Sequence, residues 1–174
     1  MEKSVLAKCG YTLVEVLTVV AMIGILSAMG YGGLQGAIAN SRVKDAAFNL
    51  AAYAESTANR ARQLNDTLCV KKKTDKMLVT YRSSCANSDS GDPIDSLEMV
   101  VGVSLVDASV EGLPGENWAA GADFIPRFGL SAMPFEGYWA AKYGNEDLYG
   151  AAVKEKMKNA ILPQKGSSGG FSDL

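Results

Sequence analysis

A long apolar segment near the N-terminus constrains the fold of this chain more than any other feature. Residues 16–41 contain no charged side chain, and Glu15 is the one charge between residues 11 and 34. A helix of about 20 residues spans roughly 30 Å, the thickness of the hydrocarbon core of a bilayer. Because apolar residues cover all sides of such a helix, the segment predicts a transmembrane helix over residues 11–34. The alternative is a buried central helix of a soluble protein.

Two lysines give this helix an orientation. Lys3 and Lys8 precede it, and only Glu2 opposes them. Positively charged flanks of membrane helices remain in the cytoplasm. We therefore expect residues 1–10 in the cytoplasm and the chain beyond the helix on the other side of the membrane.

The composition excludes several classes of function. The chain of 174 residues has 17 basic and 19 acidic residues and no histidine. The charge balance excludes a strongly basic nucleic-acid binder, and the missing imidazole excludes a Ser-His-Asp triad and a His-ligated metal. Because the sequence also lacks a phosphate-cradling loop, we expect no enzymatic activity and no cofactor.

The residues where the apolar segment begins form a specific pattern. Gly10 ends the short basic leader, Tyr11, Thr12 and Leu13 follow it, and Glu15 is the fifth residue after the glycine. Over residues 3–45 this pattern resembles the processing motif of type IV pilins and type II secretion pseudopilins. The resemblance implies that prepilin peptidase cuts after Gly10 and that the new α-amino group of Tyr11 is methylated. The family usually has Phe at the position of Tyr11.

The same resemblance implies a function, a location and partners. A pilin-like chain is a structural subunit, here expected to be a minor tip or initiation subunit of a type II secretion pseudopilus or a type IV pilus. It crosses the bacterial inner membrane once, with its C-terminal domain in the periplasm, before it enters a filament. The implied partners are prepilin peptidase, other pilins or pseudopilins, the inner-membrane assembly platform and inner-membrane lipid. The alternatives are a major pilin, a DNA-uptake pilin, or a signal-anchored periplasmic binding domain that does not polymerise.

Glu15 needs a partner, because a carboxylate in a membrane helix is costly. The α-amino group of Tyr11, on the same chain or on a neighbouring subunit, is the expected partner, and the resemblance implies the pairing between neighbours. The same resemblance assigns Thr12 and Leu13, with Glu15, to filament assembly. The alternative is that Glu15 reaches the lipid headgroups without a protein partner.

A second stretch of helix is expected directly after the membrane segment. Residues 35–65 repeat apolar or small side chains at steps of three and four, which is typical of a helix with one buried face. These positions are Ile38, Val43, Ala47, Leu50, Ala54, Ala58, Ala61 and Leu64. The helix is expected to end at Asn65-Asp66. Glycines weaken its middle, and they either let it bend or allow close helix packing; they are Gly24, Gly30, Gly32, Gly33 and Gly36.

Short β-like runs follow over residues 66–164. Residues 67–71 and 76–82 alternate around a polar turn and predict a hairpin. Residues 97–110 predict one long strand or two, and 122–130, 137–143 and 148–153 are further strand candidates. Residues 112–121 are expected to form a loop, and 153–162 fits either a helix or a strand. The Gly/Ser-rich residues 165–174 predict a flexible tail. The expected fold is therefore α+β, a long N-terminal helix packed on a small antiparallel β-sheet domain. This order, with Phe-Ile-Pro-Arg-Phe-Gly-Leu-Ser at 124–131, most resembles the GspH/FimT branch of minor pseudopilins.

The cysteines fit an exported domain. Cleavage after Gly10 removes Cys9 and leaves Cys69 and Cys85. An oxidising compartment favours a disulfide between these two cysteines, and a loop of about 15 residues gains around 3 kcal/mol from it. The alternative is two unpaired buried thiols.

Charge is unevenly distributed in the exported part. Residues 60–82 carry a local charge of +5, and residues 83–147 carry −9. The split suggests head-to-tail contacts between subunits, whereas the lysines at 71–73 are expected to be a solvated hairpin tip rather than a nucleic-acid contact. Asp89, Asp92 and Asp95 lie in an oxygen-rich loop that is a weak candidate for calcium, without the EF-hand spacing; an acidic loop without metal is the expected case.

Overall fold

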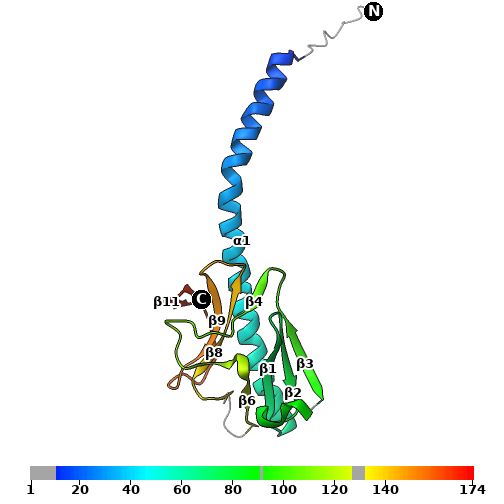
Figure 1. The fold of residues 1–174 in the computed structure, drawn as a ribbon, viewed down its shortest axis with the longest axis vertical. Helices are drawn as coiled ribbons and strands as arrows, with labels where there is room; N and C mark the ends of the chain where they lie inside the picture. The colour runs from blue at the N-terminus through cyan, green and yellow to red at the C-terminus, as the bar shows by residue number, and fades with distance from the viewer. Residues whose placement is uncertain (1–10, 91, 127–131) are drawn as a thin grey trace, which may run out of the picture. The chain divides into compact units, whose positions relative to one another are not determined.

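A long helix precedes a series of short strands in the computed structural model, which describes residues 11–90, 92–126 and 132–174 (Figure 1). Helix α1 spans Leu13–Leu64, and the strands after it form two largely antiparallel sheets. This confirms the α+β fold class, although the expected single sheet is divided into two. The chain forms two compact units, the first ending at Ile38 and the second spanning Ala39–Leu174.

The first unit contains the apolar part of α1. By length and composition this part is sufficient to cross a membrane. Its side chains from Leu13 to Leu34 are exposed, since the unit provides nothing else to cover them. A Cβ at any of its five glycines would meet no other atom, so both interpretations of the glycines stay predictions.

The second unit begins with an amphipathic stretch of the same helix. Its buried residues are Ala39, Val43, Ala46, Ala47, Leu50, Ala51, Tyr53, Ala54, Thr57, Ala58 and Ala61. Six of the eight positions predicted for the apolar face are among them, whereas Ile38 and Leu64 are exposed. The helix ends as predicted, because Asn65 adopts a φ of 49° and the Asp66 amide donates to the carbonyl of Ala61.

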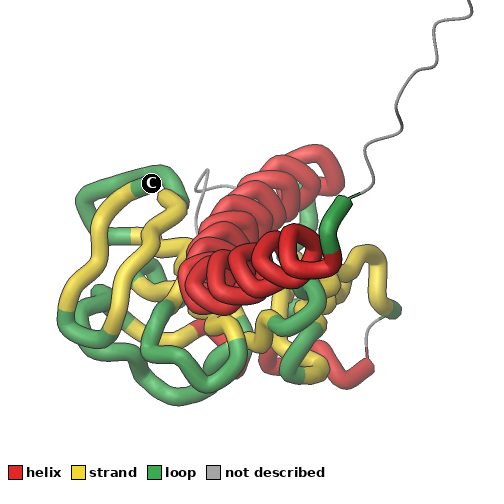
Figure 2. Tube along the Cα trace, turned by 90° about the horizontal axis from the view of Figure 1, so that it is seen from above, coloured by secondary structure: helices red, strands yellow, loops and turns green. Residues whose placement is uncertain are grey.

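The two sheets flank this part of α1 in Figures 1 and 2. The five-stranded sheet has the order β3-β2-β1-β6-β7. Its strands are β1 (Leu68–Thr74), β2 (Met77–Tyr81), β3 (Pro93–Glu98), β6 (Ala122–Phe124) and β7 (Ala132–Met133). The six-stranded sheet has the order β11-β10-β9-β8-β4, with β5 paired to β8. Its strands are β4 (Val103–Leu105), β5 (Glu116–Asn117), β8 (Gly137–Tyr143), β9 (Tyr149–Lys154), β10 (Leu162–Ser167) and β11 (Gly170–Asp173). Two 3-10 helices, η1 (Cys85–Ser90) and η2 (Trp118–Ala120), join these strands.

Aromatic side chains fill the core between the helix and the sheets. Trp118 and Trp139 meet edge to face with 5.2 Å between their ring centroids. The Trp139 indole N–H donates to the Trp118 carbonyl at 3.0 Å. Phe124 stacks on Trp139 from the neighbouring sheet. These contacts join the two sheets into one core.

Helix α1 also approaches β9 closely, because only small residues separate them. A Cβ built on Gly150 would lie 1.9 Å from the Val43 carbonyl oxygen and 3.3 Å from the Ala47 amide nitrogen. Neighbouring positions on β9 are the buried alanines Ala151 and Ala152. Glycine at position 150 is therefore required for the helix to rest on the strand at this distance.

The prediction of a flexible tail at residues 165–174 is wrong. These residues extend β10 and form β11, which pair from Gln164↔Asp173 to Ser167↔Gly170. The Gly/Ser composition reflects a tight turn, since Gly169 has a φ of 87°, and a Cβ on Gly166 would lie 2.0 Å from the Gly170 carbonyl oxygen. A side-chain hydrogen bond from Gln164 to Asp173 closes the hairpin. The β domain therefore extends beyond the expected boundary at residue 164.

The other strand predictions are confirmed in part. The predicted hairpin is β1–β2, and the candidates at 137–143 and 148–153 are β8 and β9. Residues 97–110 do not form one long strand: β3 ends at Glu98, a turn with Gly102 follows, and β4 contains three residues. The expected loop at 112–121 contains β5 and η2. Of residues 153–162, the first two end β9, residue 162 begins β10, and residues 155–161 between them form turns and irregular backbone. Residues 127–130 of the candidate at 122–130 lie outside the described part of the chain.

Candidate functional site

The start of α1 is held by a reciprocal pair of side chains. The Thr12 hydroxyl accepts a hydrogen bond from the Glu15 amide at 3.3 Å. The Glu15 carboxylate in turn accepts from the Thr12 amide at 3.4 Å and from the Thr12 hydroxyl at 3.3 Å. This arrangement is a capping box, in which two otherwise unsatisfied amides of the first helical turn find partners.

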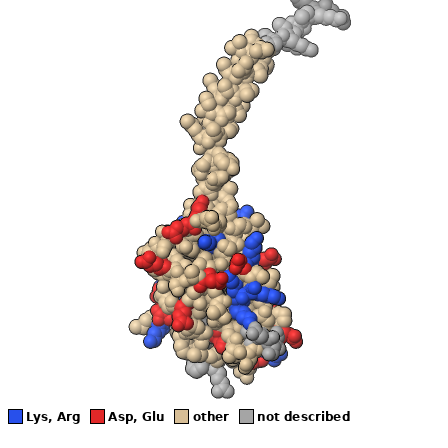
Figure 3. Space-filling view, viewed as in Figure 1, with Lys and Arg blue, Asp and Glu red and all other residues tan. Residues whose placement is uncertain are grey.

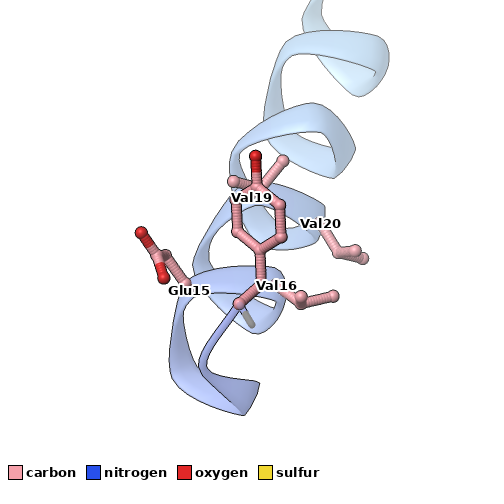
Figure 4. A pocket seen from close by; sticks show the side chains of 5 residues that line it. Glu15, Val16, Val19 and Val20 are labelled. Atoms are coloured by element: carbon pink, nitrogen blue, oxygen red, sulfur yellow. The ribbon is translucent and has the colours of Figure 1, made fainter. Parts of the chain in front are cut away.

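Apolar side chains project from the same helical turns as this polar pair. Figure 4 shows Glu15 and three valines, Val16, Val19 and Val20, projecting from the first turns of the helix, and together with Tyr11 they line a shallow hollow. Tyr11 and Leu13 are both exposed, at 84% and 79%. Gly10 lies outside the described residues, so the position of the expected cleavage site is known from the sequence alone.

Of the residues expected to act in assembly, the structure brings Thr12 and Glu15 together. Their Thr-x-x-Glu spacing is the sequence signature of a capping box, and this signature was available from residues 12–15. Glu15 therefore has a local structural role in addition to any pairing with an amine. The pairing with the α-amino group stays a prediction.

Cys69 and Cys85 form a disulfide, as predicted, with a Cα–Cα distance of 4.9 Å. Cys69 is buried in β1, and Cys85 opens η1. The carboxylate of Asp123 lies beside them, and the three candidate ligand atoms lie within 4.8 Å of one another. Both sulfurs are used in the disulfide bond, so the group does not offer a metal three ligands in this state.

One lysine of the hairpin and one arginine of α1 are paired with acids of the same molecule. Lys72 bonds to the carboxylates of Asp75 and Asp107. Although burial lowers its pKa, the hydrogen bonds to Asp107 and Asp75 outweigh this effect and raise the pKa of Lys72. Arg60 pairs with Asp95 at 3.3 Å.

Across the face of the second unit in Figure 3, basic and acidic side chains lie next to each other. Another arginine of the basic stretch, Arg82, donates to the Asp66 carboxylate at 2.9 Å and lowers the pKa of that carboxyl. That pair lies within the basic stretch, whereas the pairs Arg60–Asp95 and Lys72–Asp107 join it to the acidic stretch of the same chain. These internal pairs weaken the expectation of head-to-tail contacts between subunits.

The described part of the structure does not bring the calcium candidates together in one site. Asp95 bonds to Arg60, and Asp92 is exposed immediately before β3. The side chain of Asp89 lies outside the part that the structure describes. The calcium assignment therefore has no support beyond the sequence.

Comparison with known proteins identifies one feature of the chain. The family model of the prokaryotic N-terminal methylation motif matches residues 6–31. This match supports membership of the type IV pilin and pseudopilin family, and it indicates a pilin-like substrate of prepilin peptidase that is anchored through its apolar N-terminal helix. No curated protein and no solved structure matches the chain.

Proposed function

We propose that this chain is a filament subunit, processed after Gly10 and methylated at Tyr11, that assembles through the first half of α1. The observation that carries the proposal is the match to the methylation motif at residues 6–31 on a helix whose apolar side chains are exposed. An apolar surface of this extent must be covered, by lipid before assembly and by neighbouring helices afterwards. The inner membrane is its first location, with the second unit in the periplasm.

The second unit supports a structural role rather than a catalytic one. Its core contains two tryptophans, a disulfide joins β1 to η1, and Lys72 of its basic hairpin is ion-paired. A DNA-uptake role would need exposed cations along a track, and the ion pairs of Lys72 reduce that charge. We propose a minor subunit at the tip or in initiation, of the GspH/FimT type, in a secretion pseudopilus or a pilus.

Intact-mass measurement of the native protein from membranes tests the processing step. A chain that begins at Tyr11 and carries one extra methyl group supports the proposal, and a mass gain of two hydrogens on reduction reports the disulfide. A chain cut near Tyr31 indicates an ordinary signal peptide and an exported soluble domain. An uncut chain leaves only a membrane anchor and contradicts the filament role.

Substitution of Glu15 tests assembly. We expect Glu15→Ala to insert into the membrane and to be cleaved, yet to be lost from sheared filaments, because its carboxylate no longer pairs with an amine. Thr12→Val is the matched variant, since it weakens the cap and keeps the carboxylate. If Glu15→Ala is recovered in filaments at the wild-type level, assembly does not depend on a pairing of the Glu15 carboxylate with an amine.

A further inference from the structure

Asp123 links the segment that carries Cys85 to the sheet. In the β1–β6 register Asp123 lies directly opposite Cys69. One carboxylate oxygen accepts the Cys85 amide at 2.6 Å, and the other accepts the Ser84 hydroxyl at 2.7 Å. Neither hydrogen bond involves a sulfur atom, so both can form while the cysteines are thiols.

The surroundings of Cys85 are shaped for its docked position. Gly121, two residues before Asp123, has a φ of 137°, and a Cβ there would lie 2.8 Å from the Cys85 sulfur. Cys69 is fully buried, whereas Cys85 is partly exposed. An external oxidant therefore reaches Cys85 first, and Cys69 reacts only with a partner that is already docked over it.

We propose that Asp123 is a positioning residue for disulfide formation: it docks Cys85 over Cys69 before the bond exists and so directs ring closure. The chemistry is thiol–disulfide exchange with a disulfide oxidant. The Cys85 thiolate attacks one sulfur of the oxidant, forming a mixed disulfide and releasing the first thiolate. The Cys69 thiolate then attacks the Cys85 sulfur, and the Cys69–Cys85 bond replaces the mixed disulfide as the second thiolate leaves. Two electrons pass from the cysteines to the oxidant, and the two thiol protons pass to the released thiolates.

The second step is the one that positioning accelerates. A correctly held partner reacts as if at a very high local concentration, whereas a mobile loop must first find the buried thiol. Hydrogen bonds to a charged carboxylate are stronger than those between neutral groups. Loss of both bonds is therefore expected to slow ring closure at least tenfold, because about 1.4 kcal/mol corresponds to a factor of ten.

The test follows oxidation of the full chain in detergent micelles, in a Cys9→Ser background so that two thiols remain. Reduced protein is mixed with glutathione disulfide, quenched with acid at intervals and analysed by intact mass. Wild type should pass to the disulfide with little mixed disulfide. Asp123→Ala should accumulate the mixed disulfide with glutathione at Cys85, because its ring closure is at least tenfold slower than that of wild type.

Three variants separate positioning from a general loss of structure. Asp123→Asn keeps an acceptor for the Cys85 amide and should close faster than Asp123→Ala. Ser84→Ala loses one of the two hydrogen bonds, so its rate of ring closure should lie between those of wild type and Asp123→Ala. If Asp123→Ala does not fold, the rate of Ser84→Ala decides the question. Asp92→Ala removes an exposed carboxylate elsewhere and should match wild type. Ring closure at the wild-type rate in both Asp123→Ala and Ser84→Ala, without mixed disulfide, would overturn the proposal, as would Asp123→Asn closing as slowly as Asp123→Ala.

Discussion

Gly150→Ala tests the close approach of α1 to β9. The added methyl group would lie 1.9 Å from the Val43 carbonyl oxygen, whereas real Cβ atoms essentially never come within 3.0 Å of another atom. The helix and strand must therefore separate by about 1 Å. The obstacle is backbone, so no side chain can rotate to relieve it.

The expected cost is large for a single methyl group. Overpacking of a core typically costs 1–3 kcal/mol, and sometimes more. Because the movement also loosens the alanine contacts along the helix, we expect a loss of about 3 kcal/mol in the free energy of unfolding. This corresponds to a fall in Tm of roughly 10 °C for a domain of this size.

Tryptophan fluorescence reports this unfolding, since Trp118 and Trp139 are both buried. The full chain is heated in detergent micelles without reductant. Gly170→Ala is the matched control, because a Cβ there meets no atom within 4 Å, and its Tm should stay close to that of wild type. A Gly150→Ala variant as stable as this control would refute the reasoning from close contact.

Four further outcomes are expected. Tyr53→Phe removes the 2.6 Å hydrogen bond to Thr80 and should cost about 1–3 kcal/mol in urea unfolding at pH 7, because a buried hydroxyl is left unpaired. Burial raises the pKa of Tyr53 to about 12. Wild type should therefore lose stability as pH rises from about 10 to about 12. Over that range the free energies of unfolding of wild type and Tyr53→Phe should converge. Reduction should lower the free energy of unfolding by about 3 kcal/mol in wild type, and thermal scans of a Cys69→Ala/Cys85→Ala variant should not respond to reductant. Lys72→Met removes two ion pairs and should lower the free energy of unfolding by about 1 kcal/mol at low salt, with a smaller loss at high salt in paired thermal scans.

Periodicity was enough to predict the helix and the principal hairpin. The helix has strong signals along its whole length: an uncharged apolar segment, then a three-and-four repeat, then a stop at Asn65-Asp66. The hairpin alternates around a polar turn. Each of these signals is local, so it can be read without knowledge of the rest of the fold.

Features that depend on contacts distant in sequence were not predictable. Residues 165–174 look like a linker because their glycines suit a turn, whereas β10 pairs with β9 and β11 pairs with β10. The role of Asp123 depends on β6 lying beside β1, which no local pattern indicates. The Thr12–Glu15 cap is different, since it is local and its Thr-x-x-Glu spacing is visible in the sequence.

The cap has an electrostatic consequence for the N-terminal end of α1. A helix N-terminus carries about half a positive charge from its aligned peptide dipoles. The proposed cleavage adds a full positive charge on Tyr11, two residues before the helix begins at Leu13. Glu15, the acid of the first turn, therefore opposes both charges at once. Removal of Glu15 leaves about one and a half positive charges at this end of the helix. Glu15→Ala therefore removes more than one ion pair: it also changes the electrostatic field that acts on lipid and on neighbouring helices.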